Sequence, residues 1–480
     1  MKNYITVVGL EVHAELKTKT KAFCSCSTEF GAEPNTHVCP VCLGMPGALP
    51  VLNKKVVEYA ILAGLALNCD IQKFNKFDRK NYFYPDLAKN YQISQWDQPI
   101  CLNGHIDIQV DGEKKRIGIT RIHMEEDAGK LVHSGLTIST SDFSAVDYNR
   151  AGVPLIEIVS EPDMRSAQEA RAYMEQLKAI LEYTDVCDCK MQEGSLRCDA
   201  NISVMPEGAT EFGTRAEIKN LNSFRALERA IEYETERQIE ILEDGGHVVQ
   251  ETRTWDDVNG VTLSMRSKEE AHDYRYFPEP DIPPVLISDE DIQSIKDSMP
   301  EMPQERFARY TKEYGLPADD ANLIISSKEF SDFYDEAVAI NPDYKQISNL
   351  MLVEVNRQLN DSQLTISDVK YSPADLAELV KMSSDGVVSK NAAKDILKIM
   401  FDKGGKPQDI AKENGFIMDN DASGIEEIVN QVIAENADSV ESFKSGNQKV
   451  FGFLMGQVIR LAGKGANPKM AKDLLTEKLK

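Results

Sequence analysis

The amino-acid sequence predicts an α+β protein with a mixed, largely antiparallel β body, an all-helical connector and a small helical tail. Short β-branched runs separated by turn residues occupy roughly the first 290 residues. After Asp281-Ile282-Pro283-Pro284 the pattern becomes almost continuously helical, and a break at Gly404-Gly405-Lys406-Pro407 separates a last helical block. These observations predict three units, at residues 1–292, 293–405 and 406–480.

The length and charge of the chain restrict its class. Its 480 residues, 42% hydrophobic and 28% charged, suffice for several globular domains of roughly 100–200 residues each. The 54 Lys and Arg residues against 78 Asp and Glu residues give a net charge of −24, which disfavours non-specific adhesion to nucleic acid. No run approaches the roughly 20 apolar residues of a membrane span, and no apolar signal-peptide core follows the first residue. We therefore expect a cytoplasmic protein without membrane contact.

Local signals predict individual elements in chain order. Residues 106–110 and 116–120 are β-branched runs on either side of Asp111-Gly112, which predicts a tight hairpin. Helices are expected from residue 53 to about 67, from 166 to about 183, and from 222–223 to 245–246. Ser166 with Glu169 has the spacing of a capping box, and Ser326 with Glu329 and Ser372-Pro373 indicate further helix starts.

The first predicted strand, residues 5–16, carries an acidic and imidazole-bearing face. Because side chains alternate along a strand, Glu11, His13 and Glu15 share one face, and Leu10, Val12 and Ala14 occupy the other. Taken alone, this pattern is also typical of a half-exposed polar strand face.

Two further acidic groups favour a metal site. Glu125, Glu126 and Asp127 are consecutive, and three adjacent acids repel one another unless a cation or water lies among them. Glu157 lies in an otherwise apolar strand, where an unpaired carboxylate costs several kcal/mol. Oxygen ligands with one imidazole suit Mg²⁺ or Mn²⁺ better than zinc. If the strand extends through Glu126, alternation places Glu125 on the same face as His123 and Glu126 on the other face. Which of the two glutamates contacts the metal therefore depends on where this strand ends.

Four of the nine cysteines form two close pairs, Cys24-x-Cys26 and Cys39-x-x-Cys42, within residues 24–42. Four thiolates supply the tetrahedral soft-ligand set that Zn²⁺ prefers, and a closed set of four predicts a structural role. The first pair is one residue shorter than in a common zinc ribbon, so His37 is an alternative ligand. Four unligated core thiols are the competing interpretation.

Polar side chains on other predicted strands and one mixed segment suggest nucleotide chemistry. Arg197 shares a strand face with Asp199 and Asn201, as Lys219 does with Arg215 and Glu217. Cations beside a carboxylate-bound metal suit phosphoryl transfer, although cross-strand ion pairs explain either run equally well. Residues 76–85 mix basic and aromatic side chains, which suits stacking of a nucleotide such as a tRNA end, or simply an aromatic core edge.

The C-terminal tail differs in charge from the body. Residues 441–480 contain seven Lys and one Arg against three acids, a net charge of +5. A basic surface formed by these residues could bind a phosphate backbone, or it could be an ordinary solvated helix surface. The sequence contains no Walker-A loop, no strand-anchored G-x-G-x-x-G and no G-x-S-x-G elbow, so ATP would be held by another design and no glutaminase nucleophile is apparent.

Several long motifs resemble the B subunit of the aspartyl/glutamyl-tRNA amidotransferase (the GatB/GatE family). They are residues 9–16 (GLEVHAEL), 76–95 (KFDRKNYFYPDLAKNYQISQ), 123–130 (HMEEDAGK), 154–163 (PLIEIVSEPD), 273–281 (DYRYFPEPD), 453–457 (FLMGQ) and 465–468 (GANP). The resemblance spans essentially the whole chain.

The resemblance implies an ATP-dependent carbon–nitrogen ligase with glutamine as amido donor. Members convert Glu-tRNA(Gln) or Asp-tRNA(Asn) to Gln-tRNA(Gln) or Asn-tRNA(Asn) in a cradle-shaped body. They act as heterotrimers with a glutaminase, the A subunit, and with a small protein, the C subunit. A non-catalytic, zinc-stabilised tRNA scaffold and a stand-alone metallohydrolase are the alternatives.

The resemblance also assigns residues. It matches the Mg²⁺ site to His13, Glu126 and Glu157, with Glu11 and Glu125 close by, and the cysteine quartet to a structural zinc site that some relatives lack. The expected catalytic set is Glu11, His13, Glu125, Glu126, Glu157, Arg197 and Lys219. Substrate contacts are expected from Lys80, Tyr82, Tyr84 and Arg275, and tRNA contacts of the tail from Lys464 and Lys469.

Overall fold

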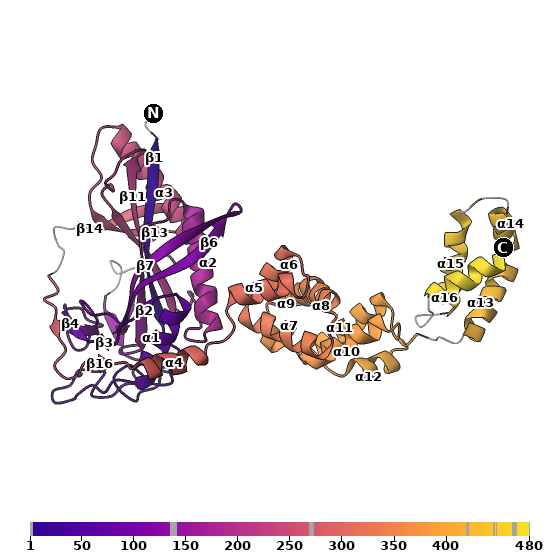
Figure 1. Cartoon of the computed structure of the whole chain (residues 1–480), viewed down its shortest axis with the longest axis horizontal. Coiled ribbons are helices and arrows are strands. Elements are labelled where there is room, and N and C mark those ends of the chain that lie inside the picture. Colours follow the sequence, from indigo (N-terminus) through magenta and orange to yellow (C-terminus); the bar gives the residue numbers. More distant parts are fainter. Residues whose placement is uncertain are drawn as a thin grey trace. The chain divides into compact units, whose positions relative to one another are not determined.

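The computed structural model describes residues 3–134, 142–267, 273–418, 422–444, 447, 449–462 and 468–479. The chain divides into two compact units, residues 1–303 and 304–480 (Figure 1). The first unit is the mixed α/β body and the second is all-helical, so the predicted α+β class is confirmed.

Within the described residues of the first unit, nine strands form one sheet in the order β14-β13-β12-β11-β1-β10-β7-β6-β2. All neighbours are antiparallel except β12 and β13. The strands are β1 Tyr4–Glu15, β2 Asp70–Ile71, β6 Cys101–Val110, β7 Glu113–Glu126, β10 Pro154–Ser160, β11 Leu196–Pro206, β12 Ala216–Lys219, β13 Glu251–Asp256 and β14 Val261–Ser267. Smaller sheets are formed by β15 Phe277–Pro278, β4 Asp78–Asn81 and β5 Tyr91–Ser94, by β16 Val285–Leu286 and β3 Phe74–Asn75, and by β8 Lys130–His133 and β9 Ser144–Asp147.

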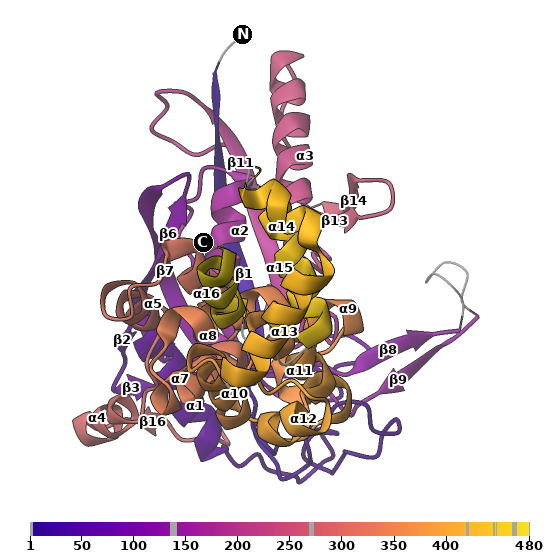
Figure 2. The same ribbon diagram turned by 90° about the vertical axis from the view of Figure 1, so that its right-hand side faces the viewer.

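The large sheet has one apolar and one polar face because side chains alternate along its central strand β1. Leu10, Val12 and Ala14 are at most 1% exposed and join a core with residues of the helices, among them Leu177 and Ile231. The helices of this unit are α1 Lys54–Ala66, α2 Ala167–Tyr183, α3 Phe224–Glu243 and α4 Asp289–Asp297, and Figures 1 and 2 show α2 and α3 running along the sheet. The opposite face of β1 is thereby left for polar side chains.

The predicted turn and helix starts of this unit are confirmed. Strands β6 and β7 form the hairpin, with φ angles of 51° at Asp111 and 83° at Gly112, a left-handed pair typical of two-residue hairpin loops. Asn53, Ser166 and Ser223 cap α1, α2 and α3 through their side chains. The capping box at Ser166 is incomplete, because Glu169 accepts from the backbone N–H of Arg165 (2.6 Å).

The second unit contains α5 Pro303–Lys312, α6 Ala318–Ile325, α7 Lys328–Ile340, α8 Tyr344–Leu350, the π-helical segment η3 Met351–Val355, α9 Asn356–Ser362, the 3₁₀ segment η4 Ile366–Asp368, α10 Pro373–Ser384, α11 Lys390–Lys403, α12 Pro407–Glu413, α13 Ala422–Glu435, α14 Ala437–Lys444, α15 Lys449–Ala462 and α16 Pro468–Leu479. Helix α7 is capped by Ser327, one residue later than expected, and Ser372 caps α10 in a complete capping box.

Two hydrophobic cores form within the helical unit. The larger extends from Tyr310 to Phe416, and the smaller gathers residues of α13, α15 and α16, including Val429, Leu454 and Leu475. Helix α11 does end at the glycine pair, where Gly404 has φ 74°. However, Ile410 of α12 belongs to the larger core, so the smaller core begins after the glycine break and not at it. No helix among the described residues is both long and apolar enough to cross a bilayer.

Candidate functional site

A row of ionisable side chains crosses the polar face of the large sheet. In the antiparallel register, His13 of β1 lies opposite Arg197 of β11 on one side and Glu157 of β10 on the other. Glu157 in turn lies opposite His123 of β7. Because directly paired residues point to the same face of a sheet, four strands bring these side chains together although up to 184 positions separate them in the sequence (His13 to Arg197).

The centre of this row is a cluster of two carboxylates and two imidazoles. His13 Nε2 lies 3.3 Å from Glu157 Oε2 and 3.6 Å from Glu125 Oε1. His123 Nε2 lies 3.4 Å from Glu157 Oε2 and 3.8 Å from Glu125 Oε2. Ligand atoms of His13, Glu125 and Glu157 all fall within 4.8 Å of one another, a spacing that one metal ion could bridge. The two carboxylates and the imidazole are the hard donor set expected for Mg²⁺ or Mn²⁺.

The structure does not bring Glu126 into this cluster. Strand β7 stays extended through Glu126, so alternation turns its side chain to the opposite side from Glu125. There the Glu126 carboxylate pairs with the ammonium of Lys89 and accepts the backbone N–H of Ile93 (3.0 Å). The geometry therefore differs from the expectation that His13, Glu126 and Glu157 lie together, and it gives that position to Glu125.

Proton affinities in the cluster follow from its charges. Burial disfavours the charged imidazole of His13, but the hydrogen bond to Glu157 and the nearby charges of Glu125 and Glu157 raise its pKa to about 9. Burial also acts to raise the pKa of Glu157, yet the charge of His123 and hydrogen bonds to both histidines hold it well below its ordinary value. The pKa of Glu11 is raised, first by burial and then by the charge of Glu157.

Ion pairs lie beside the cluster, on strands β11 and β12. Lys219 Nζ lies 2.6 Å from Asp199 Oδ2 and 3.0 Å from Glu217 Oε1, and Asn201 donates to Glu11 Oε1 at 2.9 Å. Arg197, expected beside the phosphates, is engaged with Asp127 Oδ2 at 2.8 Å. Arg197 and Lys219 therefore border the cluster, each with a carboxylate partner. Glu15 lies beside this pair, where burial and the adjacent Asp127 raise its pKa to about 8.

A cavity of about 470 Å³ opens over the cluster. Its walls include Glu11, His13, Glu157 and Lys219 from the large sheet, and Lys80, Trp96, Tyr274 and Tyr276 from the small sheet around β4 and the segments that flank it. Lys80 Nζ also lies over the ring of Tyr274, 4.8 Å from its centroid.

The other expected substrate residues lie outside this wall. Tyr82 meets the Tyr274 ring edge-on at 5.9 Å, whereas Tyr84 is half-exposed. Arg275 has φ 44°, and its carbonyl accepts from the Asn81 side chain at 2.8 Å. In the tail, Lys464 lies outside the described residues, and Lys469 belongs to α16 but its side chain is not among those described.

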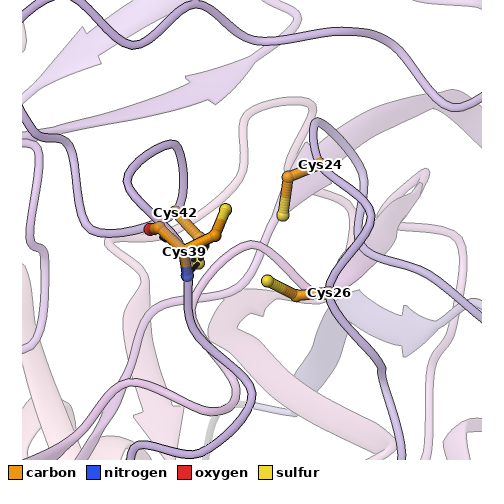
Figure 3. A group of neighbouring side chains, drawn as sticks. All are labelled: Cys24, Cys26, Cys39 and Cys42. Atoms are coloured by element: carbon orange, nitrogen blue, oxygen red, sulfur yellow. Dashed lines mark hydrogen bonds between the residues drawn. The ribbon is translucent and has the colours of Figure 1, made fainter.

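The four cysteines form a second candidate metal centre (Figure 3). The Sγ atoms of Cys24, Cys26, Cys39 and Cys42 lie within 4.8 Å of one another, and His37 is not part of this group. The hydrogen bond to Cys24 is the main cause that lowers the pKa of Cys42 to about 4. A soft set of four sulfurs fits Zn²⁺ and leaves no open position.

A buried cation accompanies the cysteine quartet. Lys21 is 0% exposed, and its ammonium lies 3.6 Å from Cys42 Sγ while donating to the carbonyls of His37 (2.7 Å) and Tyr148 (3.3 Å). Four thiolates around Zn²⁺ would carry a net charge of −2, which would offset the cost of burying this ammonium. The other five cysteines are buried and lie apart from the quartet, as expected of packing residues.

Sequence reasoning missed His123, Arg121 and Trp96 as parts of the site. The alternation of β7 was a usable signal for the first two, since Arg121, His123 and Glu125 share one strand face. No local signal identified Trp96, because its position depends on pairing between segments far apart in the chain.

Comparison with known proteins identifies the family of the chain. A family model described as GatB/GatE catalytic domain matches residues 6–293, and one described as GatB domain matches residues 332–479. The chain is 57% identical over 479 residues to the B subunit of the aspartyl/glutamyl-tRNA(Asn/Gln) amidotransferase of Caldicellulosiruptor bescii, covering 99% of each chain. The proteins of that name from Carboxydothermus hydrogenoformans and Brevibacillus brevis are 54% identical over 479 and 482 residues, each covering 100% of this chain and 99% of the relative. The chain belongs to the GatB/GatE family of aspartyl/glutamyl-tRNA(Asn/Gln) amidotransferase B subunits.

Proposed function

We propose that this chain activates and amidates the side-chain carboxylate of Glu-tRNA(Gln), Asp-tRNA(Asn) or both, using ATP. The observation that carries this proposal is the cluster of His13, Glu125 and Glu157, of which His13 and Glu157 line a cavity that is also lined by cations. A scaffold without catalytic function would not need two carboxylates and two imidazoles on a largely buried strand face, with each imidazole within 4 Å of both carboxylates.

The reaction proceeds in two steps. An oxygen of the substrate carboxylate attacks the γ-phosphorus of ATP, the bond to the bridging oxygen breaks, and ADP leaves. Ammonia then forms a C–N bond at the acyl carbon, the C–O bond to phosphate breaks, and one proton is lost to give the amide. Phosphorylation is required because a carboxylate oxygen is a very poor leaving group.

The side chains of this chain have separate roles in the proposal. His13, Glu125 and Glu157 hold a divalent cation, Mg²⁺ or Mn²⁺, which when bound would neutralise phosphate charge. Lys80, Arg121 and Arg215 line the cavity and have no carboxylate partner among the described residues, so their positive charges are available to phosphate or the substrate. Arg121 also donates to His123 Nδ1 at 3.4 Å. Lys219, Glu11 and Arg197 set the field around the cluster through their ion pairs and hydrogen bonds. Glu126 fixes the end of β7 through Lys89 and Ile93.

Partners and cofactors complete the proposal. Ammonia comes from a glutaminase, the A subunit, because no nucleophile motif for glutamine hydrolysis occurs in this chain. A small C subunit completes the heterotrimer. Zn²⁺ on the cysteine quartet has a structural role, and the basic tail, with Lys464 and Lys469, contacts tRNA. Nine free cysteines fit a reducing, cytoplasmic setting.

The test is the Glu157→Gln variant in the assembled complex, assayed with ammonium chloride in place of glutamine. The variant keeps the shape of the side chain but removes the charge that faces both histidines. We expect the rate of tRNA-dependent ATP hydrolysis to fall about a hundredfold or more. The glutaminase activity of the complex, measured with glutamine, should be largely retained. Unchanged ATP hydrolysis would contradict the assignment of Glu157, and turnover without tRNA would favour a metallohydrolase. Assays with both tRNAs decide the substrate.

A further inference from the structure

The cavity wall carries an aromatic pair that has no role in the two reaction steps. The rings of Trp96 and Tyr276 stack with centroids 4.5 Å apart and planes 12° from parallel. Trp96 follows β5 and Tyr276 precedes β15, two strands that both pair with β4, so the small sheet places them side by side. The backbone N–H of Trp96 also donates to Asp78 Oδ2 at 3.1 Å, which fixes its position.

This pair is not a conventional core contact. Trp96 is 53% exposed, whereas Trp255, the other tryptophan of the chain, is 2% exposed and donates its indole N–H to Asp257. A large aromatic side chain that is half-exposed at the wall of a cavity leaves apolar surface in water unless a ligand covers it. Tyr276 supports the indole from one side, and the neighbouring Tyr274 meets Tyr276 edge-on at 6.0 Å.

The same cavity also offers groups for phosphate. Trp96 and Tyr276 line it together with His13 and Glu157 of the cluster. Arg121 and Arg215 line it as well, without carboxylate partners among the residues that the structure describes. An aromatic surface beside cations and a candidate metal centre is the combination that a nucleotide requires, with its base on the rings and its phosphates on the charges.

We propose that Trp96, supported by Tyr276, is the stacking platform for an adenine base. This inference rests on the proposed function, in which ATP and the 3′-terminal adenosine of the charged tRNA both bring adenine to the cluster. Stacking on an aromatic side chain contributes roughly a tenfold to hundredfold gain in affinity per base, and a purine covers more ring area than a pyrimidine. The amide of the adjacent Gln95 is hydrogen-bonded to Asn75, Ile100 and Met124, so the argument for adenine at the platform uses stacking and not a contact to Gln95.

Tryptophan fluorescence tests the platform without requiring turnover. Because Trp96 and Trp255 are the only two tryptophans, the purified full chain can be titrated with the ATP analogue AMP-PNP plus Mg²⁺, with the trinucleotide CCA, and with UTP plus Mg²⁺. Quenching of the exposed tryptophan by AMP-PNP assigns the platform to ATP, and quenching by CCA assigns it to the tRNA end. The Trp96→Phe variant should lose this response, since its remaining tryptophan is buried. Absence of quenching by both adenine compounds, or equal quenching by UTP, overturns the proposal.

Kinetics of the assembled complex provide an independent measurement. We expect Trp96→Ala to raise KM at least tenfold for the one substrate whose adenine stacks there, with kcat changed less than twofold, and Trp96→Phe to recover most of the loss. Phe143→Ala, which removes another exposed aromatic side chain (67% exposed) outside the cavity lining, serves as control. If KM for both ATP and charged tRNA stays within twofold in Trp96→Ala, the platform is refuted. If the unaltered complex shows no tRNA-dependent activity, the proposed function fails while the fluorescence result still decides the platform.

Discussion

Replacing Lys21 by methionine tests whether the cysteine quartet carries the negative charge of a metal-bound tetrathiolate. Methionine approximates the length of the side chain but removes the ammonium, which lies 3.6 Å from Cys42 Sγ in a fully buried position. If the cysteines were four neutral thiols, this ammonium would have only two carbonyls as partners, and its removal would relieve an unfavourable burial. If they hold Zn²⁺ as thiolates, its removal leaves the buried negative charge of the centre less compensated.

The size of the effect can be bounded from the geometry. Two unit charges at the 3.6 Å separation of Lys21 Nζ and Cys42 Sγ attract by roughly 4–5 kcal/mol at an effective dielectric constant of about 20. Desolvation of the ammonium offsets much of this attraction, and changes next to metal ligands typically cost about 10–100-fold in metal affinity. We therefore expect the dissociation constant for Zn²⁺ to rise roughly 10–100-fold, or about 1.4–2.7 kcal/mol.

The assay is competition for Zn²⁺ by a chromophoric chelator, combined with metal analysis of the purified chain. Lys19→Met is the matched control, because Lys19 belongs to the same segment and its side chain is exposed. Circular dichroism of each variant verifies that the β body is folded. A Zn²⁺ affinity of Lys21→Met within twofold of the unaltered chain, or tighter, would refute the charge-compensation argument.

Three further predictions concern stability and tRNA binding. Deleting residues 419–480 should weaken tRNA binding and reduce its salt dependence, while the larger helical core stays folded because that core ends at Phe416. Binding is measured from 50 to 200 mM salt, and an unaltered dependence of affinity on salt would refute a tail contact. Gly64→Ala should destabilise the β body by about 1–3 kcal/mol in denaturant unfolding, because a Cβ there would overlap Cys101 Sγ and Ile71; an unchanged midpoint contradicts this packing. Asp375→Asn should destabilise the helical unit by about 1 kcal/mol at pH 7. Burial opposes ionisation of Asp375, but Lys406 and Ser372 lower its pKa, so its contribution is complete above the ordinary pKa of aspartate and disappears as pH falls through the lowered value. A pH-independent difference in thermal unfolding would exclude this charge effect.

Local rules predicted the elements of this fold well, but could not predict how the strands pair. The Asp111-Gly112 hairpin and the caps at Asn53, Ser223 and Ser372 depend on residues within a few positions of one another, and all were predictable. The order of the nine strands depends on pairings such as β1 with β10 and β11, which join residues 140 or more positions apart. Nothing in the short-range pattern determines those neighbours, which is why the row from Arg197 to His123 became visible only in the structure.

The two glutamates at the end of β7 show how a local rule and a residue-by-residue resemblance can disagree. Alternation alone groups Glu125 with His123, whereas the family motif assigned the metal position to Glu126. The structure follows alternation because Lys89 and the Ile93 N–H hold Glu126 on the other side, so the strand does not end before it. Strand phase therefore predicted correctly which glutamate lies beside His123, whereas the glutamate that binds the metal stays a prediction.

The net charge of the chain illustrates a different limit of sequence reasoning. A value of −24 disfavours polyanionic ligands on average, yet it does not describe the cavity over the cluster. The lining of that cavity includes Lys80, Arg121 and Arg215, which have no carboxylate partners in the described parts of the chain, beside the carboxylates Glu11, Glu157, Asp199, Glu217 and Glu251. Electrostatic attraction between charges falls steeply beyond a Debye length of roughly 8–10 Å, so a phosphate inside the cavity responds mainly to these side chains and to the cluster below them. Acidic residues farther from the cavity than this are screened, so they act chiefly on the solubility of the chain. The average charge therefore predicts how weakly nucleic acid adheres to the surface, whereas the balance of cations and carboxylates that line one cavity determines whether a nucleotide can bind there.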